Sequence, residues 1–93
     1  MLVGTIQVEL HLPGASSLKE KRYIVQSLKT KIRNRFNVSI AEVDFHEKWQ
    51  RTCLGIGCIS NDRRHIDTML SKILSAINQD DRVEIMDQLI EIL

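Results

Sequence analysis

The sequence is poor in the residues that mark loops, linkers and secreted proteins. One proline and four glycines in 93 residues leave no room for a disordered linker. The opening run MLVGTIQVELHL lacks the basic segment of a signal peptide and carries Gln7 and Glu9, so we expect neither a leader nor a membrane span. Two cysteines without an export signal point to a reducing compartment, and we expect a cytoplasmic protein.

Motifs for catalysis and metal binding are also missing. No glycine-rich phosphate loop follows a predicted strand, and no histidine stands in a nucleophile motif. Asp44, His46 and Glu47 lie close together in the sequence, but their spacing matches no closed metal motif. Cys53 and Cys58 are five residues apart, so on a strand they point to opposite faces and cannot share an ion. We expect no cofactor, no tightly bound divalent ion and no enzymatic activity.

The residues that are present are typical of a globular protein. Apolar residues make up 43% and charged residues 27% of the chain, which are ordinary values. A chain of this length should bury roughly 60–70% of the surface that it exposes when unfolded. We therefore expect one domain over residues 1–93.

The spacing of apolar residues predicts the first two elements. Alternation over residues 2–12 indicates a strand with one buried face. Ser17 and Glu20 form a capping box, so a helix is expected to begin there and to end near Asn37. The apolar stripe of that helix consists of Leu18, Ile24, Val25, Leu28, Ile32 and Phe36.

The second half of the chain repeats this order around a hairpin. Residues 38–43 and 53–60 are predicted strands, Asn61 or Asp62 caps a second helix, and residues 83–93 form a last strand. The order βαββαβ favours an α+β, ferredoxin-like split sandwich, in which two helices cover one face of a four-stranded antiparallel sheet. The first and third strands would be central, and the other face of the sheet would be open.

Positive charge is concentrated in the first helix. Residues 17–36 contain seven basic residues and one acid, so this segment carries +6 and the remainder of the chain carries −5. One stripe of the helix, with no acidic partner at helical spacing, holds Lys19, Arg22, Gln26, Lys29 and Arg33. Its four cations are candidate RNA-binding residues because phosphates attract such a surface, and the competing interpretation is a solvated helix face. Lys21 and Arg35 border the apolar arc and are expected to extend their charged ends into solvent.

The open sheet face lacks the aromatic residues that many RNA-binding sheets use. Its central positions would be Thr5, Gln7, Glu9, Cys53, Gly55 and Gly57. We therefore expect another chain, rather than RNA, to cover this face. The last strand supports the same expectation, because Met86, Ile90 and Ile92 would lie on one face and Ile85, Leu89 and Leu93 on the other. A homodimer through the open face, the edge of the last strand, or both is predicted.

The stretch EVDFHEKWQR, residues 42–51, contains the only tryptophan of the chain. Trp49 either folds back as a lid on local apolar surface or anchors a partner. Arg51 is two residues away and could be presented with Trp49 at an interface. The two interpretations stay open at this point.

Three blocks of the sequence resemble the YlxP-like family of small bacterial proteins. They are SLKEKR at 17–22, RNRFNVSIAEVD at 33–44 and WQR at 49–51, in the order that the family keeps. The resemblance implies a ferredoxin-like fold and no known activity, cofactor or catalytic residue. Genes of the family tend to lie near genes for translation initiation and ribosome maturation, which implies a link to the ribosome. Phe45, His46, Cys53 and Cys58 depart from the family pattern, so a general role for them is not implied.

These observations lead to three hypotheses about function. The first is a non-enzymatic cytoplasmic accessory protein that contacts structured RNA or the ribosome through the basic helix. The second is a protein-interaction or dimerisation module without a nucleic-acid role. The third is an enzyme that acts on a small molecule.

Overall fold

The six predicted elements are present in the predicted order. The structure is a computed structural model that describes residues 1–93. It contains the strands β1 (Leu2–His11), β2 (Ser39–Asp44), β3 (Arg51–Ser60) and β4 (Glu84–Ile92), and the helices α1 (Leu18–Arg35) and α2 (Arg63–Asn78). No helix is long and apolar enough to cross a membrane.

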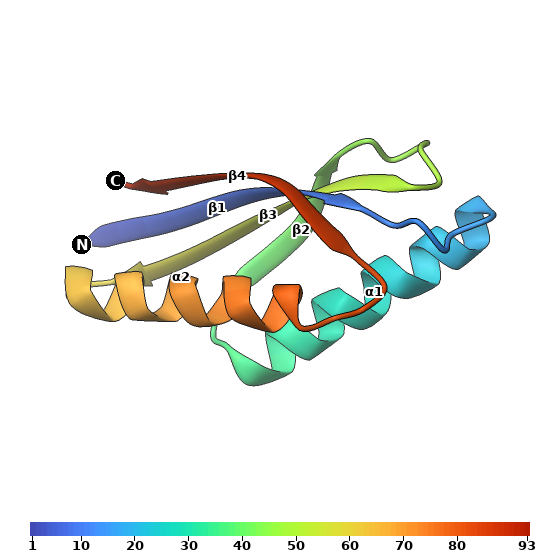
Figure 1. Cartoon of the computed structure of the whole chain (residues 1–93). Helices are drawn as coiled ribbons and strands as arrows, with labels where there is room; N and C mark the ends of the chain where they lie inside the picture. Colours follow the sequence, from blue (N-terminus) through green and yellow to red (C-terminus); the bar gives the residue numbers. More distant parts are fainter.

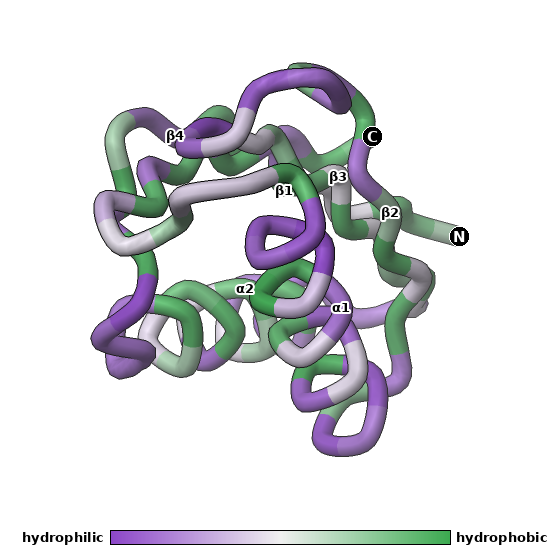
Figure 2. The backbone as a smooth tube through the Cα atoms, turned by 90° about the vertical axis from the view of Figure 1, so that its right-hand side faces the viewer, coloured by the Kyte–Doolittle hydropathy of each residue, from purple (hydrophilic) through white to green (hydrophobic).

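The strands form one antiparallel sheet in the order β2-β3-β1-β4, and both helices lie on the same face of it (Figure 1). A view along the helices shows the sheet as one layer and the helices as the other (Figure 2). β1 and β3 are central, as the sequence predicts, and the opposite sheet face is open. This arrangement is the ferredoxin-like α+β fold.

The core lies between the two layers. Alternate residues of β1 are fully buried against the helices, whereas their neighbours on the strand face the open side. The 18 buried apolar residues of this cluster come from both helices, from β1, β2 and β3, and from neighbouring loops. They include Ile6, Val8, Leu28, Ile32, Leu54, Ile66 and Ile73. Gly4 is required where α2 crosses β1, because a Cβ atom there would lie 2.4 Å from Cγ2 of Ile66.

Both helices begin at side-chain caps. The Ser17 hydroxyl accepts a hydrogen bond from the backbone N–H of Glu20 at 3.1 Å, as the capping box predicts. The return bond is shifted by one residue, because the Glu20 carboxylate accepts from the backbone N–H and the hydroxyl of Ser16. At the second helix Asp62, one of the two predicted caps, accepts from the backbone N–H of Arg64 at 2.9 Å. The helix α1 ends at Arg35 with Phe36 as its cap, directly before Asn37, so it ends where the sequence predicts.

A β-bulge in β4 corrects the predicted assignment of its faces. Ile85 pairs with Leu10, but the next pair joins Asp87 to Glu9, so the pairing shifts at Met86. Ile85 therefore lies on the same, helix-covered face as Ile90 and Ile92, whose partners on β1 are Ile6 and Gly4. The prediction that Ile85 shares a face with Leu89 and Leu93 is wrong, because strict alternation does not continue through a bulge.

The turn between α2 and β4 is fastened to α1. Asp80 is buried, and its carboxylate accepts two hydrogen bonds from the Arg82 guanidinium, at 2.9 Å from Nε and 2.7 Å from Nη2. The same Nη2 lies 3.2 Å from the Ser27 hydroxyl of α1. The bonds from Arg82 outweigh the effect of burial and lower the pKa of Asp80.

Candidate nucleic-acid interface

The predicted basic stripe is on the surface of α1. Lys19, Arg22, Gln26 and Arg33 are exposed and Lys29 is half-buried. The four ion pairs of the chain join His11 to Glu84, Lys21 to Glu42, Arg51 to Glu9, and Arg82 to Asp80. None of the four cations of the stripe therefore has a carboxylate within 4.0 Å.

The position of the stripe follows from the buried face of α1. At 100° per residue the stripe lies beside the buried arc of Val25, Leu28 and Ile32, on the side of α1 that borders β2. The Arg33 guanidinium confirms this placement, because its Nη2 lies 3.4 Å from the backbone oxygen of Ile40 in β2. The stripe therefore runs along the side of α1 that borders β2.

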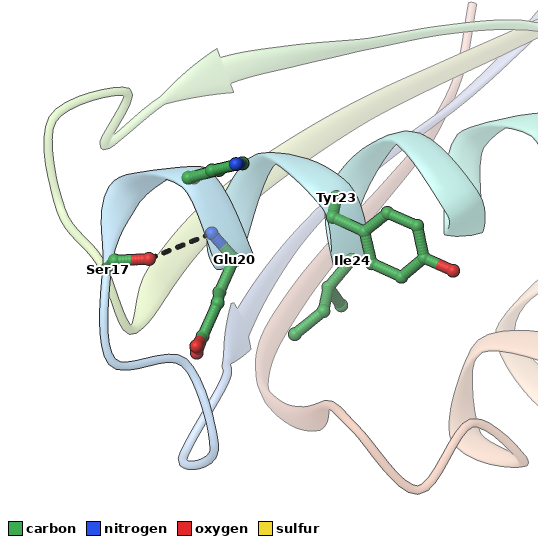
Figure 3. Close-up of a pocket in the computed structure, with 5 residues that line it drawn as sticks. Ser17, Glu20, Tyr23 and Ile24 are labelled. Carbon is green, nitrogen blue, oxygen red and sulfur yellow. Dashed lines mark hydrogen bonds between the residues drawn. The ribbon is translucent and has the colours of Figure 1, made fainter.

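Tyr23 is a candidate functional residue that the sequence analysis missed. It is 71% exposed and follows directly after Arg22. Its ring extends away from α1 beside an open hollow of about 580 Å³ that Ser17, Lys19, Glu20 and Ile24 also line (Figure 3). The signal was available, because Tyr23 lies four residues after Lys19 and outside the apolar arc of the helix.

The chemistry of this hollow differs from that of the stripe. The backbone N–H and the hydroxyl of Ser16 lower the pKa of Glu20, so the carboxylate in the hollow is ionised at neutral pH. A carboxylate repels phosphate but accepts hydrogen bonds from the amino groups of a base. The exposed Tyr23 ring offers a surface on which an unpaired base could stack.

A second group of cations lies between the two helices. Arg35 and Phe36 at the end of α1 face His65, Thr68 and Lys72 of α2 across a hollow of about 430 Å³. The prediction that Arg35 extends outward is confirmed, since it is exposed and its guanidinium carbon lies 5.3 Å from the centre of the Phe36 ring. The helix layer thus carries cations on both flanks of α1.

Lys21 corrects the prediction that its charged end reaches solvent. It is only 1% exposed, and its Nζ lies 2.8 Å from Oε2 of Glu42. Nζ also donates to the backbone oxygen of Phe45 at 2.6 Å and to that of His46 at 3.2 Å. All three ammonium hydrogens therefore have partners, and Lys21 fastens the β2–β3 loop to the first turns of α1.

Glu42 completes this buried polar cluster. Burial alone would raise its pKa, but hydrogen bonds from Lys21 and Thr52 and the positive charge of Lys21 lower it below its ordinary value. No buried side-chain nitrogen or oxygen of the chain lacks a hydrogen-bond partner. The cluster is accordingly a fully hydrogen-bonded network that connects α1, β2, β3 and the β2–β3 loop.

The rest of the 42–51 stretch divides into structural residues and an exposed tip. Gln50 donates to the backbone oxygens of Pro13 at 3.3 Å and Ala15 at 3.1 Å, and so joins the loop to the β1–α1 connection. Trp49 is 55% exposed, so nearly half of this side chain is covered by its own chain, and the interpretation as a lid on local apolar surface stays open. Its role as an interface anchor stays a prediction.

Arg51 is already engaged within the chain. Its guanidinium carbon lies 3.8 Å from the centre of the Phe45 ring, and its Nε donates to Oε1 of Glu9 at 2.7 Å. Arg51 is therefore a less available interface residue than the sequence predicts, although half of its side chain is still exposed. Phe45 is also the one non-glycine residue with a positive φ, 64°.

The open sheet face is unfavourable for nucleic acid. Its central strands carry no aromatic residue, as predicted, and the Phe45 ring that borders them is covered by Arg51. A shallow hollow on this face contains three carboxylates, from Glu9, Asp44 and Asp87. Negative charge here and positive charge on α1 give the two faces of the molecule opposite character.

The residues weighed as metal ligands do not come together. The Asp44 carboxylate accepts from the backbone N–H of Phe45, and His46 Nε2 lies 3.2 Å from the backbone oxygen of Glu42. No group of three His, Cys, Asp or Glu side chains is arranged to hold a metal ion. Cys53 and Cys58 are both buried and unpaired, and burial raises the pKa of the Cys53 thiol.

Known proteins resemble the chain over nearly its whole length. The family described as "Protein of unknown function (DUF503)" matches residues 3–90. The protein named "Uncharacterized protein YlxP" of Bacillus subtilis (strain 168) is 35% identical over 83 residues, which cover 89% of this chain and 90% of that protein. The resemblance inferred from the three sequence blocks is confirmed, and the chain belongs to the DUF503 family.

Proposed function

We propose that the chain is a non-enzymatic accessory protein that binds structured RNA, such as ribosomal RNA, through α1. The observation that carries the proposal is the set of cations at Lys19, Arg22, Lys29 and Arg33, none of which is paired with a carboxylate. Surface cations that serve only solubility are usually interspersed with acids. An unpaired stripe on one margin instead matches a phosphate backbone, which releases counterions when it is neutralised.

The distribution of acids favours the helix layer over the open sheet face as the RNA-binding surface. The carboxylates of Asp87 and Glu91, which form no ion pair, lie on the open sheet face, according to the pairing of β4 with β1. A polyanion would be repelled from that face and attracted to the helix layer. The hollow that Arg35 and Lys72 line extends the same attraction toward α2.

The non-enzymatic part of the proposal rests on the engagement of the perturbed acids. Glu42 is held by Lys21 and Asp80 by Arg82, and hydrogen bonds and charge from these cations lower the two pKa values. The third acid with a lowered pKa, Glu20, is held by Ser16 at the start of α1. Strongly perturbed groups that line a cleft indicate catalysis, whereas these three acids stabilise a loop, a turn and a helix start.

The test is binding of a labelled ribosomal RNA fragment across a salt series. Arg22, Lys29 and Arg33 are changed to Ala singly and together. Each single change should lower the slope of log affinity against log salt by about one unit, and the triple variant by about three. The matched control carries Ala at Lys48, Arg63 and Arg64, which removes the same charge from other unpaired, exposed positions.

The control separates a local site from net charge. Equal losses in the two triple variants would show that only overall charge matters and would refute α1 as the site. Unchanged affinity and slope in the α1 triple variant would reduce the stripe to a solvated helix face. The second hypothesis, an interaction module without RNA, would then be favoured by the open edge of β4.

A further inference from the structure

The two edges of the sheet differ in how they are protected. β2 is the shorter edge strand, with six residues, and its pairing with β3 is interrupted by a bulge between Glu42 and Asp44. Arg33 donates to the backbone oxygen of Ile40 on this strand. Short length, a bulge and a neighbouring cation are the devices that keep an edge from pairing with another chain.

β4 has little of this protection. It is nine residues long and contains no proline, lysine or arginine, and after the bulge its residues alternate regularly to Ile92. Val3 and Leu93 exchange both backbone hydrogen bonds, at 2.9 and 2.8 Å. In an antiparallel ladder such pairs recur at every second residue, so Asp87, Leu89 and Glu91 bond to β1. The N–H and C=O groups of Gln88, Ile90 and Ile92 consequently point away from the sheet.

Exposed apolar side chains follow the same segment. Leu89 is 53% exposed, Ile90 44% and Leu93 71%. Leu89 and Leu93 lie on the open face and Ile90 on the helix-covered face. An edge that combines free backbone groups with apolar side chains on both faces is a template for another strand.

We propose that this edge pairs with the same edge of a second copy, in antiparallel orientation about a two-fold axis at Ile90. Only an even-numbered residue of this segment can pair with another by reciprocal hydrogen bonds, because only these groups point outward. An axis at Asp87 or at Leu89 also pairs even-numbered residues with each other, but each of them places two acids opposite each other. The axis at Asp87 pairs Asp87 with itself, and the axis at Leu89 pairs Asp87 with Glu91. An axis at Gln88 would pair Ile90 with the bulged Met86.

The axis at Ile90 avoids these conflicts. Ile90 then faces Ile90 of the second copy, Leu89 faces its Glu91, and Asp87 faces its Leu93. Three outward pairs with two bonds each would give about six new backbone hydrogen bonds. The two sheets would continue as one of eight strands, with all four helices on the same face, because the axis is perpendicular to the sheet. This proposal does not depend on RNA binding.

Sedimentation equilibrium at high micromolar concentration tests the proposal. The parent should have twice the chain mass of 10.7 kDa. Ile90→Pro removes an outward N–H that β1 does not use, so it should halve the mass without unfolding the protein. Ile90→Lys should do the same by placing two cations opposite each other. Ile59→Lys is the matched control, because Ile59 is 67% exposed on the open face of β3, away from the β4 edge.

Each outcome supports or refutes dimerisation through the β4 edge. A monomeric parent overturns the proposal, and so does a dimer that survives Ile90→Lys with normal circular dichroism. Dissociation by Ile59→Lys alone would assign the interface to the open face instead. If Ile90→Pro fails to fold, the lysine variant decides. The position of the axis is checked by oxidation of single-cysteine variants, in which position 90 should cross-link faster than position 89. The reverse order would refute that axis.

Discussion

Lys21 on α1 and Glu42 on β2 form an ion pair in which Nζ and Oε2 are 2.8 Å apart and the lysine is 1% exposed. The pair lies beneath the β2–β3 loop, and the same ammonium group holds two backbone oxygens of that loop. This contact fixes the position of the charge-rich β2–β3 loop against α1.

Removal of the ammonium should therefore be costly. Lys21→Met keeps the aliphatic stem but leaves two loop carbonyls without this donor and the Glu42 carboxylate with only the bond from Thr52. We therefore expect a loss of about 3 kcal/mol in the free energy of unfolding. Urea unfolding measures the change. Lys19→Met is the control, because Lys19 is exposed and unpaired, and it should stay within about 0.5 kcal/mol of the parent. A loss below about 1 kcal/mol for Lys21→Met would contradict a role in fastening the loop.

The stability of the protein should fall in acid because of Asp80. Hydrogen bonds from Arg82 lower its pKa in the folded protein below the ordinary value of 3.8. The contribution of the Asp80–Arg82 pair is complete above that ordinary value and is lost as the pH falls through the lower, folded pKa. The difference in unfolding free energy between the parent and Asp80→Asn should therefore shrink between about pH 5 and pH 2.

Urea titrations at several pH values measure this difference. Asp67→Asn is the control, because Asp67 is exposed and makes no ion pair, so its difference from the parent should change much less. A difference for Asp80→Asn that stays constant down to pH 2 would show that the carboxylate is not stabilised by Arg82.

The sequence was sufficient to predict the order of elements because each has its own period and boundary signals. Alternation marks β1, and Ser17 and Asp62 cap the helices as expected. The faces of β4 could not be predicted, because the bulge at Met86 arises from its pairing with β1 rather than from local sequence.

The candidate site was predictable in part for a similar reason. A helical wheel is enough to find the stripe, since exposure on an amphipathic helix depends on local spacing. The burial of Lys21 depends on Glu42, 21 positions later in the sequence, and on loop carbonyls that only tertiary structure brings near it. Tyr23 carries no charge and is therefore not part of the charge pattern, although the helical wheel places it outside the apolar arc.

Gly4 and Gly57 offer a matched pair of glycine substitutions on neighbouring strands. A Cβ at Gly4 would meet Cγ2 of Ile66 at 2.4 Å, in the packed layer between β1 and α2, and Gly4→Ala should cost about 1–3 kcal/mol of stability. A Cβ at Gly57 would have only the backbone oxygen of Gly4 within reach, at 4.0 Å, so Gly57→Ala should be neutral or slightly stabilising. Thermal unfolding of both variants measures the contrast, and equal effects would argue against the close approach of α2 to Gly4.

Tyr23 separates base stacking from charge attraction within the proposed RNA interface. If an unpaired base stacks on the exposed ring, Tyr23→Ala should weaken binding of a ribosomal RNA fragment with single-stranded loops by about 1–3 kcal/mol. The slope of affinity against salt should not change, because no cation is lost. Tyr23→Phe keeps the ring and should bind like the parent. Fluorescence anisotropy of labelled RNA gives both quantities. Full affinity in Tyr23→Ala would limit the interface to phosphate contacts, whereas equal losses in the Ala and Phe variants would point to the hydroxyl instead of the ring.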